Sequence, residues 1–449
     1  MLAATVEEEA HQSYMESPII GIRTSAKLRL QLPSAKQEVH GSTTFDYKGT
    51  EVENHASIEI YQRLGVRPFI NARGTWTYLS GSLALPEVRH AMDCAARHFV
   101  DVFELQQAAG RRLAELSGAE AGMVTSGAAA AMATAAAACM AGTDHEKIWQ
   151  LPDTTGMKDQ VIMLGGRIPF DSALRLTGAK LVVVMELEEL EAAIGNETAM
   201  IYTCWVGERL EKAVAIAKKA GVVLMLDDAA GIPPFENLSR YADMGLDLYC
   251  FSGGKGLRGP QSSGVLLGRR DLIEAALAQS TPWEGAVCRP MKVGKEEIIG
   301  VLTAIETWAK LDLNELNREW LEKVESIAKR VESVPGVTTE ITIPDGANRY
   351  PTLAILWDEQ AFGLTVADCD RLLRDGEPRI EVLTSSNPSL VTAVLYETLQ
   401  ETEKTAGTPE DKLRLVSMTL QPGEDLIVGN RLCEILNSAR TPHPHDRAS

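Results

Sequence analysis

Short apolar runs alternate with helical segments through the middle of the chain, and this alternation limits the fold more than any other feature. Helical patterns fill several of the gaps, among them 128–141, 187–194 and 210–219. Such a pattern predicts an α/β fold in which a mainly parallel, seven-stranded sheet is covered by helices on both faces. Ligands of such sheets bind at the carboxyl ends of the strands. The expected strands are 121–125, 161–164, 181–185, 199–203, 222–226, 248–251 and 264–267.

A lysine lies where one of these strands opens into a glycine-rich loop. Lys255 follows the run 248–251, and Gly253, Gly254 and Gly256 surround it. A partly buried ammonium group loses hydration and its pKa falls, which makes the amine a nucleophile that can hold a carbonyl compound as a Schiff base. We expect the glycines to adopt positive φ angles and to let the backbone approach a bound group closely.

Carboxylates end the preceding strand. Asp227 and Asp228 follow the run 222–226 and precede Ala229. A carboxylate at a strand end, small residues after it and a lysine in the next loop are what a pyridoxal 5'-phosphate (PLP) site requires. The lysine binds the cofactor, the carboxylate keeps the pyridine nitrogen protonated, and the small residues leave room for the flat ring. Turns at strand ends also favour Asp and Gly, so each feature alone is weak evidence.

A third element follows the first strand. Ser126 and Gly127 connect it to the alanine-rich helix 128–141. Free backbone N–H groups, a hydroxyl and the positive end of the helix dipole suit a phosphate. A helix whose small residues only serve close packing is the alternative interpretation. All three elements fall at carboxyl ends of strands, so we expect them to meet in one crevice.

The motifs resemble those of the fold-type I PLP-dependent enzymes. More narrowly, they are similar to the selenocysteine synthase-like group, which includes bacterial L-seryl-tRNA selenium transferase and the D-glucosaminate-6-phosphate ammonia-lyase type. The similarity extends from about residue 58 to about residue 440, and it rests on four motifs taken as a set. These motifs are 65–75, 151–158, 251–261 and 289–296.

The resemblance implies roles for individual residues. Lys255 and Asp227 would be the catalytic pair, as Schiff-base lysine and as partner of the pyridine nitrogen, with Asp228 as the competing assignment. Ala229 would lie under the ring. The implied cofactor-binding residues are Ser126, Gly127, Ala128, Arg167, Asp227, Ala229, Ser252 and Lys255.

The resemblance also points to substrate ligands. Relatives tend to carry a His-Arg pair where this chain has Gly166 and Arg167, so the usual stacking partner of the ring is missing here. Arginine suits a substrate carboxylate because its planar fork makes two parallel hydrogen bonds. The candidates are Arg73, Arg379 and Arg289, the last joined by Lys292 and expected to approach from a neighbouring subunit; surface ion pairs or a solvated basic run are the alternatives.

Charge, cysteine and histidine usage exclude several classes of protein. The 62 acidic residues outnumber the 44 basic ones, for a formal net charge of −18, which argues against a nucleic-acid partner. The seven cysteines form no Cys-x-x-Cys pair, and no histidine occurs between His145 and His443, so we expect neither a metal site nor disulfides. No apolar run approaches the length of a membrane span.

We expect four parts along the chain. These are a partly disordered extension at 1–57 with a short strand at 27–32, a large PLP-binding domain at 58–290, a small α+β domain at 291–440 and a disordered tail at 441–449. The small domain should contain a long helical stretch from 296 to about 334, strands at 337–343, 352–357 and 414–419, and a closing helix at 424–438.

The predicted activity is that of a PLP-dependent lyase. A small amino acid or amino sugar acid would lose its Cα proton and a leaving group at Cβ, giving a 2-oxo acid and ammonia. Alternatives are a selenium transferase acting on L-seryl-tRNA, an aminotransferase, an aldolase or a racemase, and a binding protein that keeps the fold without turnover. We expect a cytoplasmic homodimer or larger homo-oligomer with active sites at the subunit interface.

Overall fold

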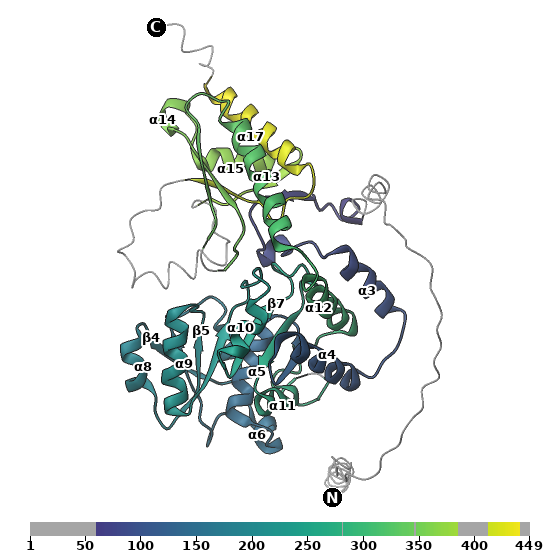
Figure 1. The fold of residues 1–449 in the computed structure, drawn as a ribbon, viewed down its shortest axis with the longest axis vertical. Helices are drawn as coiled ribbons and strands as arrows, with labels where there is room; N and C mark the ends of the chain where they lie inside the picture. The colour runs from purple at the N-terminus through teal and green to yellow at the C-terminus, as the bar shows by residue number, and fades with distance from the viewer. Residues whose placement is uncertain (1–59, 281, 345–346, 385–411, 441–449) are drawn as a thin grey trace, which may run out of the picture. The chain divides into compact units, whose positions relative to one another are not determined.

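The computed structural model describes residues 60–280, 282–344, 347–384 and 412–440 (Figure 1). The chain divides into two compact units, Met1–Leu64 and Gly65–Ser449. Only residues 60–64 of the first unit are described, so all elements below belong to the second. The extension predicted at 1–57, its strand at 27–32 and the tail predicted at 441–449 lie outside the described residues.

A seven-stranded sheet carries most of the candidate site. Its strand order is β2-β8-β7-β6-β5-β3-β4, and neighbouring strands from β4 to β7 are parallel. Only β8 runs antiparallel to its neighbours. The expected mainly parallel, seven-stranded sheet is confirmed. The strands are β2 (Ala121–Thr125), β3 (Gln160–Leu164), β4 (Lys180–Val184), β5 (Thr198–Thr203), β6 (Val223–Asp227), β7 (Leu248–Ser252) and β8 (Gly264–Gly268).

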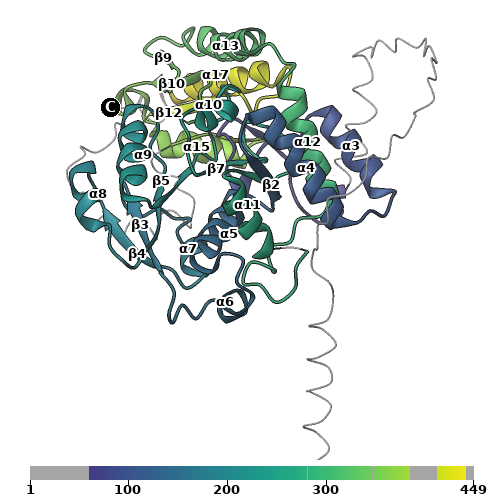
Figure 2. The same ribbon diagram turned by 60° about the horizontal axis from the view of Figure 1, so that its bottom comes forward.

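Helices cover both faces of this sheet, which is why its strands are apolar on both sides. Side chains from the two faces form two separate apolar clusters. Figure 2 shows α9 and α5 on opposite sides of the strands. The first face carries α3 (Pro86–Ala96), α4 (Val102–Ser117), α8 (Leu187–Ala193), α9 (Glu208–Ala220), α10 (Asn237–Asp243) and α12 (Lys295–Trp308). The second carries α5 (Ala128–Ala141), α6 (His145–Gln150), α7 (Ser172–Arg175) and α11 (Arg270–Ala278).

The helical stretch expected from 296 to about 334 is present, and a short break at 309–312 divides it into two helices. α12 ends at Trp308, and α13 (Leu313–Val331) begins after the cap residue Asp312, whose carboxylate accepts a hydrogen bond from the Asn314 N–H at 2.9 Å. The Trp308 indole donates to the Leu257 carbonyl at 2.9 Å. This bond fixes the end of α12 against the loop that carries Lys255.

The carboxyl-terminal part is built on a second, antiparallel sheet with the order β12-β10-β9. Apolar side chains of this sheet pack with those of α13 and of the closing helix in a third cluster. The three strands and the closing helix confirm the expected elements. The division at residue 290 stays a prediction, since Gly65–Ser449 forms one compact unit. The elements are β9 (Thr338–Thr342), β10 (Thr352–Leu356), α14 (Glu359–Phe362), α15 (Val366–Asp375), β12 (Leu413–Val416) and α17 (Glu424–Arg440).

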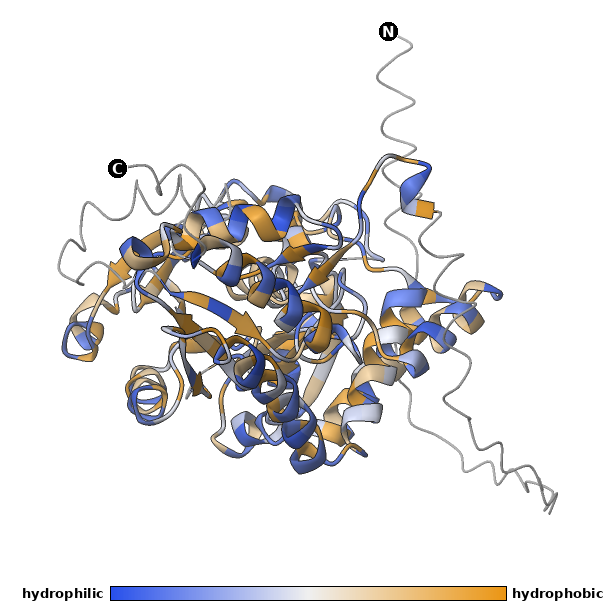
Figure 3. Ribbon diagram, turned by 90° about the horizontal axis from the view of Figure 1, so that it is seen from above, coloured by the Kyte–Doolittle hydropathy of each residue, from blue (hydrophilic) through white to orange (hydrophobic). Residues whose placement is uncertain are grey.

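A small parallel pairing joins distant parts of the chain and was not expected. β1 (Phe69–Asn71) pairs with β11 (Arg379–Glu381), and the short helix η1 (Thr77–Leu79) follows β1. Figure 3 shows the strands coloured mainly as hydrophobic, whereas the helices alternate between the two colours. Within the described ranges, no helix combines the length and the apolar composition that a membrane crossing needs.

Candidate active site

Lys255 lies half-buried in the loop between β7 and β8, and backbone hydrogen bonds hold this loop in place. The Ser252 N–H donates to the Ala229 carbonyl at 3.1 Å, which joins the loop to the end of β6. From the opposite direction, the Ser82 hydroxyl donates to the Lys255 carbonyl at 2.7 Å. The lysine is therefore held beside the carboxyl end of the neighbouring strand.

The glycines around Lys255 allow close packing of the loop and do not serve positive φ angles. None of Gly253, Gly254 and Gly256 has a positive φ, so that expectation is wrong. A Cβ atom at Gly256 would lie 1.9 Å from the Ile232 carbonyl oxygen, and one at Gly253 would lie 2.0 Å from the Ser263 Oγ. These positions exclude side chains because neighbouring segments pack directly against the loop backbone.

Asp227 ends β6 and is buried, with hydrogen-bond donors on both carboxylate oxygens. The Tyr202 hydroxyl donates to Oδ2 at 2.7 Å, and the Ala229 N–H donates to Oδ1 at 3.0 Å. The Tyr202 hydroxyl also lies 4.0 Å from the sulfur of Met132, a residue of α5. Asp227 therefore points to the face of the sheet that α5 covers.

Asp228 points to the other face. Its carboxylate accepts a hydrogen bond at 2.6 Å from the hydroxyl of Tyr241, which belongs to α10. Burial raises the pKa of Asp228, although the Tyr241 hydrogen bond and the Lys255 ammonium act in the opposite direction. Because α5 carries the candidate phosphate site, this geometry favours Asp227 over Asp228 as partner of a cofactor bound there.

The candidate phosphate loop lies at the same sheet edge. Gly127 has a φ of 141°, which favours glycine, and as the cap residue of α5 it has no side chain that could accept from the first N–H groups of the helix. The N–H groups of the first helical turn have no partner within the helix, and they mark its positive end. Thr125 and Ser252 both pair with Gly264, which places the phosphate loop and the Lys255 loop on either side of one residue.

Arg167 is engaged with a carboxylate of its own loop. It forms an ion pair with Asp171, which also pairs with Arg175 at 3.1 Å. Gly166 has a φ of 97°, a backbone conformation that residues with a side chain rarely adopt. A histidine would be strained at this position, which explains the glycine. A cofactor role for Arg167 stays a prediction.

Arg379 belongs to β11, and Arg73 follows the end of β1, so both are associated with the small pairing and not with the seven-stranded sheet. Arg73 is only 2% exposed, and its guanidinium donates to the Val382 carbonyl at 3.3 Å and lies 5.6 Å from the Tyr78 ring centre. Arg379 forms an ion pair with Glu381. Both guanidinium groups are thus engaged in internal contacts, and their substrate-binding roles stay predictions.

The loop with Arg289 and Lys292 contacts the phosphate loop of the same chain. The Ser126 hydroxyl donates to the Met291 carbonyl at 3.1 Å. Arg289 is half-buried and Lys292 is exposed. The approach of Arg289 and Lys292 to a site of a neighbouring subunit stays a prediction; within their own chain, their loop contacts Ser126.

No motif in the sequence singles out Tyr202, Cys204 or Cys250. Tyr202 is 1% exposed, and its hydroxyl also lies 3.2 Å from the Cys204 sulfur. The Cys250 thiol lies 3.7 Å from the Asp227 Oδ1. A usable signal was present, because a tyrosine near the carboxyl end of a buried strand needs a polar partner for its hydroxyl.

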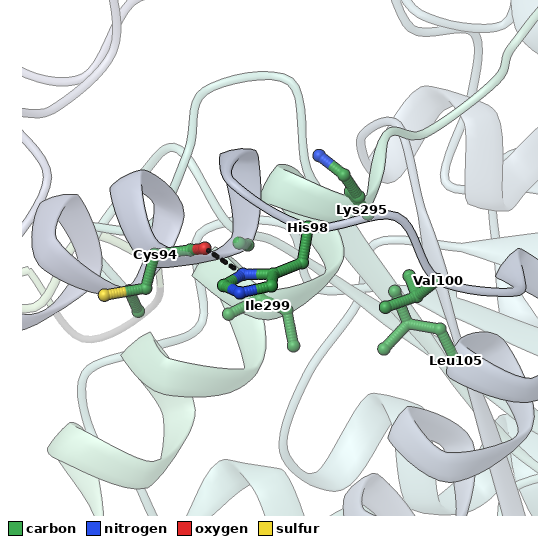
Figure 4. Close-up of a pocket in the computed structure, with 8 residues that line it drawn as sticks. Cys94, His98, Val100, Leu105, Lys295 and Ile299 are labelled. Carbon is green, nitrogen blue, oxygen red and sulfur yellow. Dashed lines mark hydrogen bonds between the residues drawn. The ribbon is translucent and has the colours of Figure 1, made fainter.

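An apolar pocket of about 390 Å³ lies elsewhere (Figure 4). His98 lines it, with its Nδ1 3.3 Å from the Cys94 carbonyl, and Lys295 lies at its side. None of the predicted site residues lines this pocket. Among the residues that the structure describes, no group of three or more His, Cys, Asp or Glu side chains could hold a metal ion.

The fold and this sheet edge define a PLP-dependent enzyme of fold type I. The chemistry of the side chains fits the cofactor: an amine for its aldehyde, a buried carboxylate for its ring nitrogen and an uncapped helix end for its phosphate. All three lie at the carboxyl ends of adjacent or nearly adjacent strands.

Comparisons with known proteins agree with this class. The model of the aminotransferase class-V family matches residues 173–356. A 5'-C-glycyluridine monooxygenase-decarboxylase from Streptomyces sp is 33% identical over 339 residues, covering 71% of this chain and 83% of that protein. A D-glucosaminate-6-phosphate ammonia lyase from Salmonella typhimurium is 29% identical over 335 residues, covering 71% of this chain and 87% of that protein.

A solved structure extends the similarity to the fold. The structure of a D-glucosaminate-6-phosphate ammonia-lyase matches with a TM-score of 0.70 and 27% identity, covering 85% of this chain and 98% of that one. The chain belongs to the aminotransferase class-V family of PLP-dependent enzymes. The resemblance to the group that contains the ammonia-lyase type is confirmed, and the alternative of a binding protein without turnover is set aside.

Proposed function

We propose that this enzyme is a lyase that acts on a small amino acid or amino sugar acid. It would remove the proton from Cα and a leaving group from Cβ, releasing a 2-oxo acid and ammonia. The observation that carries the proposal is the placement of Lys255 and Asp227 at adjacent strand ends, connected by the hydrogen bond from Ser252 to Ala229.

Each residue has a separate task in this proposal. PLP, when bound, supplies an electron sink for negative charge at Cα. The Lys255 amine would bind the cofactor and, once the substrate has displaced it, take the Cα proton as general base. The Asp227 carboxylate would hold a proton at the ring nitrogen, with Ala229 against the ring. The phosphate would be bound by Ser126, Gly127, Ala128 and Ser252.

Arg289 is the arginine best supported as a ligand for the substrate carboxylate. It belongs to the loop that contacts Ser126, and it is half-buried. The guanidinium groups of Arg73 and Arg379 are already engaged. The Salmonella relative is named a D-glucosaminate-6-phosphate ammonia lyase, which supports an amino sugar acid as the substrate class.

A second candidate function comes from the Streptomyces relative. That protein is named a 5'-C-glycyluridine monooxygenase-decarboxylase, and its 33% identity exceeds the 29% of the ammonia lyase. An oxygen-dependent decarboxylation of an amino acid group is therefore the main rival. Transamination, aldol cleavage and racemisation share the same cofactor chemistry. Selenium transfer to L-seryl-tRNA fits less well, since the chain carries a formal net charge of −18.

Two measurements test the proposal in sequence. The first is the absorption spectrum of the purified protein before and after borohydride, followed by mass mapping of the reduced peptide, which should carry the cofactor on Lys255. The second is a screen of hydroxy amino acids and amino sugar acids for ammonia and 2-oxo acid. Release of both without oxygen uptake supports the lyase, whereas oxygen uptake with carbon dioxide release would replace it with the rival.

We also propose that the enzyme works in the cytoplasm as a homodimer or larger homo-oligomer. The seven cysteines are free in the structure, which suits a reducing compartment. Several large apolar side chains are exposed on the single chain. Exposed apolar surface of this kind is typical of a region that a second subunit covers.

A further inference from the structure

The carboxylate of Asp227 accepts one bond from its own backbone turn and one from the neighbouring strand β5, and the Cys250 thiol of β7 lies 3.7 Å from its Oδ1. The Ala229 N–H belongs to the turn that Asp227 itself begins. The Tyr202 hydroxyl reaches Oδ2 from β5, the next strand in the sheet. The second bond sets the rotation of the carboxylate plane, which the first bond alone leaves open.

Tyr202 is built to donate this bond. Its side chain is 1% exposed, and its hydroxyl lies 4.0 Å from the sulfur of Met132 in α5, so the ring is enclosed between the sheet and that helix. Burial, and then the charge of Asp227, raise the pKa of the Tyr202 hydroxyl well above its usual value. The hydroxyl therefore stays protonated and donates a hydrogen bond to the Asp227 carboxylate.

Another buried tyrosine shows what a purely structural hydroxyl looks like. Tyr249, on β7, is also fully buried, and its hydroxyl donates to the Leu238 carbonyl at 3.1 Å. That bond satisfies a polar group on the face opposite α5 and touches no candidate site residue. Both tyrosines are buried strand residues whose hydroxyl groups donate a hydrogen bond, but only the Tyr202 hydroxyl donates to a candidate site residue.

We propose that Tyr202 is a positioning residue, which sets the orientation of the Asp227 carboxylate towards the ring nitrogen of the cofactor. The inference rests on the cofactor site of the proposed function and not on the reaction proposed there. It makes the carboxyl end of β5 a part of the cofactor site.

The test uses the full chain, stripped of cofactor and titrated with PLP. Tyr202→Phe removes only the hydroxyl and keeps the packing against α5. Tyr249→Phe is the matched control, since it removes an equally buried, hydrogen-bonded hydroxyl from the same sheet. Asp227→Ala and the double variant Tyr202→Phe/Asp227→Ala complete a cycle that shows whether Tyr202 acts through Asp227. Thermal melting of each cofactor-free variant checks the fold.

We expect Tyr202→Phe to weaken PLP affinity by about five- to thirtyfold, since it removes a hydrogen bond to a charged group. It should also move the pH midpoint of the visible absorption of the bound cofactor. In the Asp227→Ala background the same change should alter affinity less than about twofold. Tyr249→Phe should lower the melting temperature to a similar degree while leaving affinity and spectrum unchanged.

Two results would overturn the inference. One is an affinity and a spectrum that Tyr202→Phe leaves unchanged. The other is an equal effect with and without the Asp227 carboxylate, which would mean that Tyr202 acts by another route. Neither result depends on which substrate the enzyme uses, so a failed screen for ammonia release leaves this inference standing.

Discussion

Among single side chains, Lys255 has the most direct role in the proposed chemistry, because both cofactor attachment and proton removal depend on its amine. We expect Lys255→Ala to lower turnover by at least about a thousandfold, because the variant loses both the general base and the covalent attachment of the cofactor. The fold should persist, since the backbone contacts of this loop do not involve the side chain. Steady-state kinetics and circular dichroism measure the two effects. Lys310→Ala, at an exposed position after α12, is the control and should keep full activity. Full activity in Lys255→Ala would contradict the assignment of Lys255 as the cofactor-binding lysine.

Cys204 offers a test of the electrostatics near Asp227. Cys204 is exposed at the residue level, as Cys94 is, but the protein atoms packed around its thiol, and then the negative charge of Asp227, raise the pKa of this thiol to about 12. Thiolate is the reactive form, so alkylation at pH 8 should be slow and should quicken by about tenfold per pH unit until the pH approaches that value. Peptide mapping after a timed iodoacetamide pulse gives the rate. Cys94, exposed on α3, should be alkylated faster than Cys204 at pH 8. Equal alkylation rates at the two cysteines would contradict the prediction.

At this scale, the sequence predicted residues that have a visible chemical motif and missed those that act through contacts. Lys255, Asp227 and Ser126 stand at strand ends in recognisable motifs, and the structure brings them to one edge. Tyr202 was hidden inside an apolar run, because a strand pattern records burial and does not show which group a buried hydroxyl meets. The contact of Ser126 with Met291 joins residues far apart in sequence, which no local pattern predicts.

Among the elements, strands were predicted more reliably than helix ends. The strands of the main sheet follow their apolar runs closely, because burial on both faces leaves a strong signal. The break between α12 and α13 was missed although Asp312 is a good cap residue. The β1 to β11 pairing was missed because three-residue strands carry too few residues to show a pattern.

The contact between α4 and β2 gives a prediction at the scale of elements. A Cβ atom at Gly110 in α4 would lie 2.2 Å from the Gly122 carbonyl oxygen of β2. Alanine normally favours a helix by about 1 kcal/mol over glycine. We nevertheless expect Gly110→Ala to lower the free energy of unfolding by about 2 kcal/mol, because the helix must move away from the strand.

Urea unfolding measures this change. Gly195→Ala is the matched control, since no atom lies within 4 Å of the added Cβ and the backbone there has no positive φ. That variant should stay within about 0.5 kcal/mol of the parent protein. A Gly110→Ala protein as stable as the control would show that α4 does not pack this closely on β2.

For the molecule as a whole, the exposed apolar side chains near the pocket of Figure 4 predict self-association. Phe99 is fully exposed, Val100 lines the pocket, and Phe103 stacks edge-on against Trp283 with ring centres 5.0 Å apart. We expect a homodimer in analytical ultracentrifugation, and Phe99→Glu should weaken it by at least about tenfold. Leu372→Glu, at an exposed position on α15, should leave it intact. A monomeric parent protein would contradict the prediction.

The candidate cofactor residues stand at the ends of β2, β6 and β7, three segments brought together only by the folded sheet. A molecule that contacts all three segments binds the folded chain and not the unfolded chain, in which these segments are far apart. Cofactor binding should therefore raise the free energy of unfolding. The increase depends on the ratio of the free cofactor concentration to the dissociation constant, and it is about 4.1 kcal/mol when that ratio is a thousand. The amide hydrogens of these three distant segments would then exchange with solvent more slowly and in concert, as a single cooperative patch.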